Sequence, residues 1–375
     1  MILYPLLMIL FVGAVAYACA LYVYFGWQLH AYVLSESLKL NASHATKGVS
    51  IIVCARNEQH NLIALLPLLF QQEYPNFEVV VADDASNDGT GPFLRAQQQT
   101  YPALRVVSIA ERPQDMHPKK HALQQAIRLA RYDCLLFTDA DCRPASVRWL
   151  SAMSQQLSGR IQVVLGYSPY YRQPGWLNRF ISYETLHTGL LYVSSALAGR
   201  PYMGVGRNLA YRKMFFEGGS KFQKHRLLTG GDDDLWVNEH ASRANTKVML
   251  TPEALVYSVP QTTWKRYVHQ KTRHLHVSQH YSGWDQLWLG TLSLSTVLTW
   301  VAGILLLILS HKWYVIVGLF LLRWLILATA LRVAGRRLHD PINLWLLPIL
   351  DFLHVIYYIA IGMRALATTN ISWKS

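Results

Sequence analysis

The sequence is poor in charge, because Asp, Glu, Lys and Arg make up only 15% of its 375 residues, against about 25% in a typical soluble domain. Apolar residues reach 52%, and the longest apolar runs lie at the two ends of the chain. We therefore predict membrane segments at both ends and not a larger soluble core. Asp and Glu (22 residues) are fewer than Lys and Arg (35 residues), and the resulting formal net charge of +13 predicts an anionic partner.

Cysteine is scarce as well, and Cys19, Cys54, Cys134 and Cys142 show no CxxC spacing. This excludes a disulfide framework and a zinc finger, and it favours a reducing compartment. No helix-turn-helix or ribonucleoprotein pattern accompanies the positive charge, so nucleic acid is not an expected partner. Acidic lipid headgroups and nucleotide diphosphates are the anions that remain.

The N-terminal run, residues 2–25, carries no charge and is long enough to span a bilayer. It lacks the basic start and the short apolar core of a cleaved signal peptide. We therefore expect an uncleaved membrane anchor over residues 1–26. The C-terminal region, residues 286–364, contains three further apolar stretches, at about 287–309, 313–331 and 342–363.

The last apolar stretch contains Pro348 and Asp351, and whether it spans the membrane, kinks or lies in the interface stays open. Arg323 falls inside the stretch before it, where a charge is expected to be paired or close to an interface. Arg332, Arg336 and Arg337 predict a cytoplasmic loop by the positive-inside bias. We expect an integral protein of the inner (plasma) membrane with its central domain in the cytoplasm.

The central region, residues 47–283, alternates short apolar strands with amphipathic helices. This order predicts an α/β domain with a mainly parallel sheet and helices on both faces. Ligands of such sheets bind beyond the carboxyl ends of the strands. The expected strands are 49–53, 77–82, 104–108 and 134–138, and the expected helices are 58–72, 90–99 and 119–131.

Acidic residues gather where two of these strands end. Asp83 and Asp84 follow the second strand, and Asp139 and Asp141 follow the fourth. Carboxylates at alternate positions can both reach a hard cation such as Mg²⁺ or Mn²⁺, which in turn holds a diphosphate. Capping and turn formation do not require such a pair, although they account for the polar residues after Asp84, namely Asn87, Asp88 and Thr90.

A third acidic group, Asp232, Asp233 and Asp234, follows Gly230 and Gly231 and opens a helix. Helix capping explains one of the three carboxylates, and another is suited to accept a proton from a substrate hydroxyl. Further along, Gln270 and Arg273 share one face of a helix that leads towards the first C-terminal span. They form either a buried polar pair or a platform beneath a sugar and its diphosphate.

Together these motifs resemble the family 2 glycosyltransferases, which are inverting enzymes with a GT-A fold, a Rossmann-like mixed sheet. VSIIVCARNE resembles the opening strand of that family, VVADDASNDGT its first aspartate motif and FTDADC its Asp-x-Asp motif. GGDDDLW lies where the family has its base, and QKTRH where many members have Gln-x-x-Arg-Trp. The resemblance covers the central region and implies a hexosyltransferase that uses Mg²⁺ or Mn²⁺.

The resemblance also implies roles for individual residues. Asp233 would be the general base, with Asp232 as the alternative. Asp141 and Asp139 would bind the metal, and Asp139 would also support the nucleoside. Gln270 and Arg273 would hold the diphosphate. The remaining contacts to the nucleotide-sugar, expected to be a UDP-sugar, would come from Arg56, Asn57, Glu58, Asp83, Asp84, Lys119 and Lys120.

His274 stands where processive polysaccharide synthases have a tryptophan, and the C-terminal spans are fewer than a polymer channel needs. We therefore expect transfer of a single sugar to the hydroxyl of a lipid or lipid-linked acceptor, with a processive synthase as the alternative. A sugar nucleotidyltransferase is less favoured, because CARNEQHN lacks the glycine-rich loop of such enzymes. A membrane protein that only binds nucleotides would leave Asp232–Asp234 without a purpose. Residues 176–197 form either an interfacial helix or a helix packed on the sheet.

Overall fold

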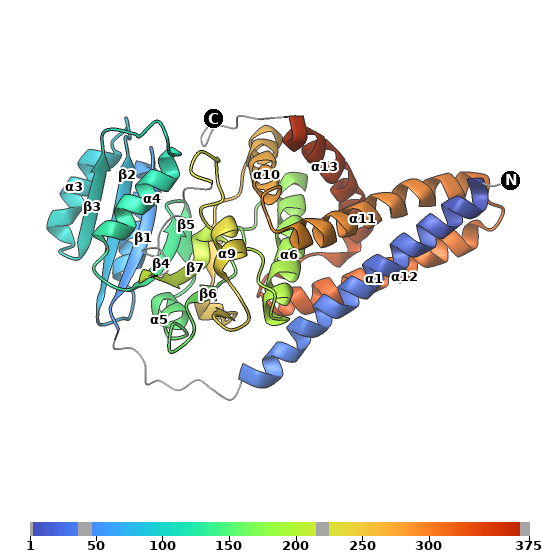
Figure 1. The fold of residues 1–375 in the computed structure, drawn as a ribbon, viewed down its shortest axis with the longest axis horizontal. Coiled ribbons are helices and arrows are strands. Elements are labelled where there is room, and N and C mark those ends of the chain that lie inside the picture. Colours follow the sequence, from blue (N-terminus) through green and yellow to red (C-terminus); the bar gives the residue numbers. More distant parts are fainter. Residues whose placement is uncertain (1–2, 37–46, 215–224, 368–375) are drawn as a thin grey trace. The chain divides into compact units, whose positions relative to one another are not determined.

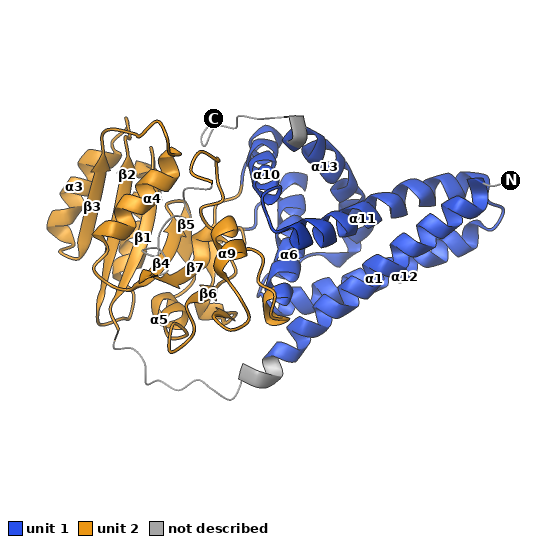
Figure 2. Ribbon diagram, in the orientation of Figure 1, with its two compact units in different colours: residues 1–37, 172–195, 261–370 blue, residues 38–171, 196–260, 371–375 orange. Residues whose placement is uncertain are grey.

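The computed structural model describes residues 3–36, 47–214 and 225–367. The chain divides into two compact units (Figure 2), which are described separately. We call residues 38–171, 196–260 and 371–375 the sheet unit, and residues 1–37, 172–195 and 261–370 the membrane unit.

The sheet unit contains a seven-stranded sheet with the strand order β3-β2-β1-β4-β7-β6-β8 (Figure 1). The four predicted strands form its parallel half and each extends one or two residues beyond its expected end, while β7 runs antiparallel to β4. β5 and β9 form a separate antiparallel pair. The strands span β1 Val49–Ala55, β2 Phe77–Asp84, β3 Leu104–Ile109, β4 Cys134–Asp139, β5 Cys142–Pro144, β6 Val163–Leu165, β7 Leu209–Arg212, β8 Thr246–Val248 and β9 Val256–Ser258.

Each face of this sheet has its own apolar core. On one face, α2 Gln59–Phe70, α3 Thr90–Thr100 and α5 Trp149–Ser154 bury side chains against alternate residues of β1 and β2. On the other face, α4 Pro118–Leu129 and α9 Asp234–His240 pack on the opposite alternate set. The strands β1, β2 and β4 are buried on both sides, which explains their almost continuous runs of apolar residues.

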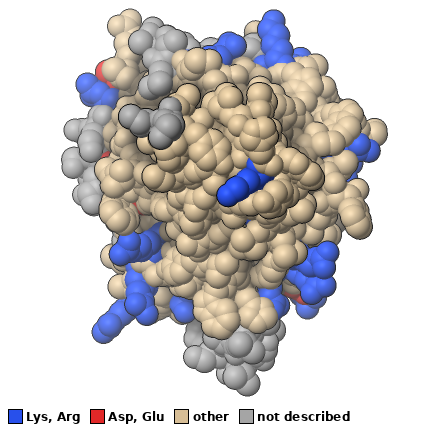
Figure 3. Space-filling view, turned by 90° about the vertical axis from the view of Figure 1, so that its right-hand side faces the viewer, with Lys and Arg blue, Asp and Glu red and all other residues tan. Residues whose placement is uncertain are grey.

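The membrane unit is built from helices. They span α1 Leu3–Glu36, α6 Trp176–Leu197, α10 Trp264–Ser278, α11 Gly283–Leu309, α12 Trp313–Arg337 and α13 Leu347–Ala367. Four stretches among the described residues are long and apolar enough to cross a bilayer: Leu3–Tyr32, Gly283–Leu309, Trp313–Arg337 and Leu344–Ala365. The face shown in Figure 3 is mostly free of charged side chains, with one basic side chain near its middle and the other Lys and Arg side chains at its margin.

The two ends of this helix bundle differ in charge. At one end, the hydroxyl of Tyr4 lies 3.0 Å from the Ser310 hydroxyl, and Lys312 is the basic residue of the α11–α12 turn. At the other end, Phe25 of α1 packs on Trp288 at the start of α11, with ring centroids 5.7 Å apart. The last two turns of α12, which carry three arginines, belong to this second end, so it is the basic end of the bundle.

Arg323 is fully buried in α12, and as predicted it is paired. Its two terminal nitrogens donate to Asp351 of α13 at 2.5 and 3.1 Å. The indole N–H groups of Trp300 and Trp324 also donate to Asp351, at 2.9 and 3.2 Å. The first turns of α13 are therefore fixed beside the middle of α11 and α12. Farther along α13, Tyr357 packs against Tyr267 of α10 and Phe180 of α6.

The helix predicted over residues 176–197 exists as α6, and it groups with the membrane helices and not with the sheet. His187 Nε2 lies 3.2 Å from the Tyr22 hydroxyl of α1, and Lys271 of α10 donates to Glu184 at 2.5 Å. α10 falls in the same unit, so the compact sheet unit excludes 172–195 and 261–283 from the continuous 47–283 domain expected from the sequence. A sequence pattern can show that a helix is buried, but it does not show which element the helix packs against.

Candidate active site

The carboxyl ends of β1, β2 and β4 lie side by side at one edge of the sheet. Ala55 pairs with Asp83 across β1 and β2, and Cys54 pairs with Asp139 across β1 and β4. The parallel register therefore brings the two predicted aspartate motifs to the same edge, as expected for a site at the strand ends.

The loops that follow β1 and β2 hold each other in an unusual backbone conformation. Asn57 (φ 55°) and Ala85 (φ 48°) both lie in the left-handed region, which costs an alanine about 1–3 kcal/mol. Asn57 accepts a hydrogen bond from the Asn87 amide through its side chain, and its own amide donates to the Ser86 hydroxyl. Strain of this kind is found at ligand-binding loops, and it lies within the predicted nucleotide pocket.

The two aspartates that end β2 have different partners. Asp84 is fully buried and accepts from Arg112 Nε at 2.8 Å, with Arg56 Nη1 at 3.8 Å from its other oxygen. Asp83 is also buried, and its carboxylate accepts from the Ser86 amide at 3.3 Å. Asp84 therefore forms ion pairs with both Arg56 and Arg112. Asp88 accepts from the Thr90 amide, as predicted for a turn residue.

Asp139 and Asp141 form the most suitable place for a metal ion. A carboxylate oxygen from each, together with the Cys142 thiol, lies within 4.8 Å of the others. Burial and repulsion by Asp139 raise the pKa of Asp141 to about 6, and burial raises the pKa of Cys142 well above its usual range. Two carboxylates beside a protonated thiol match the oxygen ligands that Mg²⁺ and Mn²⁺ prefer. The residues present therefore fit the metal that the fold implies.

Lys119 is the cation of this acidic cluster. Its Nζ lies 2.8 Å from Asp232 Oδ2 and 3.9 Å from Asp139 Oδ1. Burial alone would raise the pKa of Asp232, but the ammonium of Lys119 lowers it to about 2. Asp232 is therefore ionised and paired at neutral pH.

Asp233 differs from its neighbour. Burial and the charge of Asp232 raise the pKa of Asp233, and its Oδ2 accepts a short bond, 2.6 Å, from the Gly206 amide. A pocket is lined by Lys119, Asp139, Asp232 and Asp233 together. The structure thus brings together four of the predicted residues from three separate stretches of the chain.

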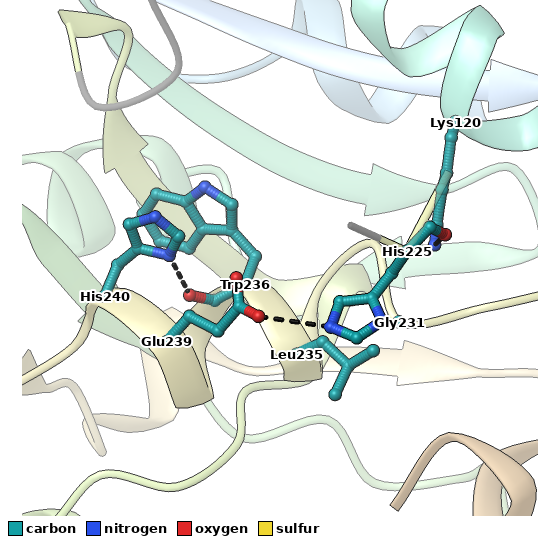
Figure 4. A pocket seen from close by; sticks show the side chains of 7 residues that line it. All are labelled: Lys120, His225, Gly231, Leu235, Trp236, Glu239 and His240. Atoms are coloured by element: carbon teal, nitrogen blue, oxygen red, sulfur yellow. Dashed lines mark hydrogen bonds and ion pairs between the residues drawn. The ribbon is translucent and has the colours of Figure 1, made fainter. Parts of the chain in front are cut away.

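Two predicted residues face elsewhere. Lys120 is buried and donates through Nζ to the His225 carbonyl at 2.5 Å. It lines a second pocket (Figure 4), where His225 Nε2 lies 3.1 Å from a Glu239 carboxylate oxygen. Asp234 is the acidic residue in the first turn of α9 and accepts from the Leu235 amide, so it is the carboxylate that its place at the N-terminus of a helix explains.

The remaining predicted residues lie on two elements. Glu58, which accepts from the Asn61 side chain at 2.7 Å, precedes α2 in the sheet unit. Gln270 and Arg273 belong to α10 in the membrane unit and are half-buried. Lys271 between them is the buried partner of Glu184.

Sequence reasoning missed Arg207. It lies in the 3₁₀ turn Gly206–Asn208 and donates to Ser168 and Tyr170. The one hint in the sequence was the pair of glycines that precede it, which marks a turn but no partner.

Comparison with known proteins places this geometry in a family. The profile of Glycosyl transferase family 2 matches residues 50–219, which contain the first two aspartate motifs and the strands that carry them. Residues 50–219 therefore match a domain of glycosyltransferase family 2. This confirms the predicted family and, together with the mixed sheet, the predicted fold class.

Among curated relatives of this glycosyltransferase, Glycosyltransferase AglE of Haloferax volcanii is 25% identical over 49% of the chain and 58% of its own length. Beta-monoglucosyldiacylglycerol synthase of Trichormus variabilis is 35% identical over 26% of the chain and 21% of its own length. The chain therefore spans less than two thirds of each relative.

One solved structure covers nearly the whole chain. The mannosyltransferase PcManGT from Pyrobaculum calidifontis, in complex with GDP-Man and Mn²⁺, superimposes with a TM-score of 0.58. It covers 97% of this chain and 100% of its own, at 21% identity. This likeness supports the GT-A fold together with the membrane helices.

Proposed function

We propose that the protein is an inverting glycosyltransferase. It moves a sugar from a nucleotide-diphospho-sugar, UDP-linked by our prediction, to a hydroxyl of a lipid or lipid-linked acceptor in the membrane. The observation that carries the proposal is the pairing of two unlike carboxylates, Asp232 and Asp233, in one pocket with Asp139. One is neutralised by Lys119 and the other keeps a raised pKa suited to proton transfer.

In this reaction Asp233 accepts the proton of the acceptor hydroxyl. The acceptor oxygen forms a bond to the anomeric carbon while the bond from that carbon to the diphosphate oxygen breaks, and the configuration inverts. The Gly206 amide orients the Asp233 carboxylate by its 2.6 Å hydrogen bond. A positioned general base contributes about 10²–10⁴ in rate.

The donor side of the site must stabilise the departing diphosphate. Asp141 and Asp139 would hold a Mg²⁺ or Mn²⁺ ion, which neutralises phosphate charge when bound. Lys119 supplies a fixed positive charge in the same pocket. Arg56, Asn57 and Asp83 lie along the strand ends, where the nucleoside would bind, with Gln270 and Arg273 proposed for the diphosphate.

Two observations favour a membrane-resident acceptor. Four stretches among the described residues are able to cross a bilayer, and one similar protein is named as a synthase of a monoglucosyldiacylglycerol. Four spans and His274 also favour transfer of one sugar over processive synthesis, which remains the alternative.

We further propose that the sheet unit lies in the cytoplasm. α1 ends and α11 begins at the same end of the helix bundle as the three arginines of α12. The positive-inside bias assigns that end to the cytoplasm, and the chain leaves α1 towards residue 47 from this end. The inner (plasma) membrane is the expected location.

Turnover by the full-length protein in detergent tests the proposal. Radiolabelled UDP-glucose, UDP-galactose, UDP-N-acetylglucosamine and GDP-mannose are each supplied with Mn²⁺ and dioleoylglycerol or a lipid extract. We expect labelled lipid from one donor, with Asp233→Asn and Asp141→Asn each reducing turnover at least 100-fold. Turnover like that of the wild type in both variants would refute the assignment of base and metal ligand.

A further inference from the structure

Arg207 is held more rigidly than a surface arginine. Its Nε donates to the Ser168 hydroxyl at 2.8 Å, its Nη1 to the Tyr170 hydroxyl at 2.8 Å and its Nη2 to the Ser168 carbonyl at 3.0 Å. The guanidinium also lies 4.4 Å from the centroid of the Tyr170 ring. Three hydrogen bonds and a stacked ring fix its position and, with it, that of the turn it belongs to.

Ser168, which accepts a hydrogen bond from Arg207, is itself connected by hydrogen bonds to the residues of the proposed metal site. The Ser168 hydroxyl donates to the Val256 carbonyl at 2.5 Å, and the Ser258 amide donates to the Pro169 carbonyl. Val256 and Ser258 belong to β9, which pairs with β5 so that Ser258 lies opposite Cys142. The Val259 amide closes the connection by donating to the Asp141 carbonyl at 3.3 Å.

The other side of the turn contacts the base. Gly206, directly before Arg207, donates its amide to Asp233 Oδ2 at 2.6 Å. A Cβ on Gly206 would stand 2.7 Å from the same oxygen, so a larger residue there would displace the Asp233 carboxylate. The Asp233 carboxylate therefore sits against a turn whose place is fixed by Arg207.

We infer that Arg207 is a positioning residue, which sets the orientation of Asp233 relative to Asp141 through the Gly206 amide. A path of hydrogen bonds and short backbone segments runs from the Asp141 carbonyl through β9, Ser168, Arg207 and Gly206 to Asp233. An inverting displacement needs the base and the leaving group on opposite sides of one carbon, so the spacing of these two carboxylates limits the rate. The inference rests on the proposed function, because it assigns Asp233 as the base.

A double-variant cycle in the full-length protein tests this inference, with Mn²⁺, the sugar donor that the wild type uses and dioleoylglycerol. Arg207→Gln alone is expected to lower kcat about 10–100-fold, as found when a residue behind a reacting group is lost. In the Asp233→Asn background the same change is expected to cost less than about threefold, because the base it orients is already absent. Affinity for UDP or GDP with Mn²⁺, measured by thermal shift, stays within about threefold.

Arg212→Gln, on β7, is the matched control and leaves kcat within about twofold, since its contacts to Asp133 and Leu157 lie outside this path. Tyr170→Phe removes one hydrogen bond to Arg207 and keeps the ring. If Arg207→Gln does not fold, Tyr170→Phe should show the same difference in kcat loss between the two backgrounds, with a smaller loss in each. Equal losses in the two backgrounds, or a tenfold loss of nucleotide affinity, would overturn the inference. A wrong assignment of Asp233 as the base would be recognised separately, because Asp233→Asn alone would then keep full turnover.

Discussion

Replacing Lys119 by methionine gives the most direct test of how the acidic pocket is stabilised. The change removes the ammonium that lies 2.8 Å from Asp232 and 3.9 Å from Asp139. Loss of one partner from a buried ion pair costs about 3–5 kcal/mol. Because 21% of the Lys119 side chain remains exposed, we expect the lower end of that range, about 3 kcal/mol.

The effect must also depend on pH with a definite sign. In the wild type, the lowered pKa of Asp232, about 2, contributes stability that is present above the unfolded value near 4 and is lost as the pH falls through 2. In Lys119→Met, the pKa of Asp232 rises, so the carboxylate takes up a proton in mild acid and the penalty shrinks. The difference in Tm is expected to be about 6–12 °C at pH 7.5 and clearly smaller at pH 4.5.

Thermal unfolding of the full-length protein in detergent measures this difference. Lys120→Met is the matched control, because this neighbouring lysine is buried against a carbonyl and its pKa is lowered by that burial. Its charge lowers the pKa of Asp232 less than the charge of Lys119 does, so its effect on Tm should shrink less between pH 7.5 and 4.5. Asp232→Asn added to Lys119→Met should restore most of the lost stability. A penalty in Lys119→Met that is equal at both pH values, or absence of that rescue, would refute the reasoning.

Three further predictions concern the base, the metal and the membrane unit. Burial and Asp232 raise the pKa of Asp233, so kcat should fall as the pH drops through that pKa, and Asp232→Asn should move this acidic limb to lower pH; a move to higher pH contradicts the assignment. EDTA should abolish the rise in Tm that UDP or GDP gives with Mn²⁺, and Asp141→Asn should abolish it even with excess Mn²⁺; a rise that survives both treatments would exclude a metal at this site. Asp351→Asn leaves Arg323 buried without its counter-charge and should destabilise the protein by about 3–5 kcal/mol. The double variant Arg323→Met with Asp351→Leu should recover much of that loss in thermal unfolding. A double variant no more stable than Asp351→Asn would argue against a stabilising role of the pair.

The parallel half of the sheet was predictable from the sequence chiefly because β1, β2 and β4 are buried on both faces and appear as apolar runs. Because the carboxyl ends of parallel strands lie at one edge of a sheet, the strand ends also predicted that the motifs of Asp83 and Asp139 would lie close together. β5, β6, β8 and β9 have three residues each, too few for any periodic pattern. Their pairing depends on contacts with distant segments, which no local signal records.

The two adjacent lysines show a second limit. Lys119 and Lys120 are equally basic and match the same motif, but successive residues of a helix point about 100° apart. Only the packing of α4 on the sheet decides which of them meets Asp232 and which meets His225. Arg207 escaped detection for a related reason, since its partners Ser168 and Tyr170 lie 39 and 37 residues away.

The path of the chain between its two units limits how the protein can be engineered. The polypeptide passes from one unit to the other near residues 38, 172, 196 and 261, so α6 is inserted within the sheet unit, whereas α10 follows the last strand, β9, and leads into α11. Cutting the chain at 47 and 283 would keep both helices but remove α1 and α13, exposing the surfaces that Tyr22 and Tyr357 cover. A water-soluble fragment obtained by trimming the ends should therefore aggregate, and a soluble version would require redesign of the exposed faces of α6 and α10.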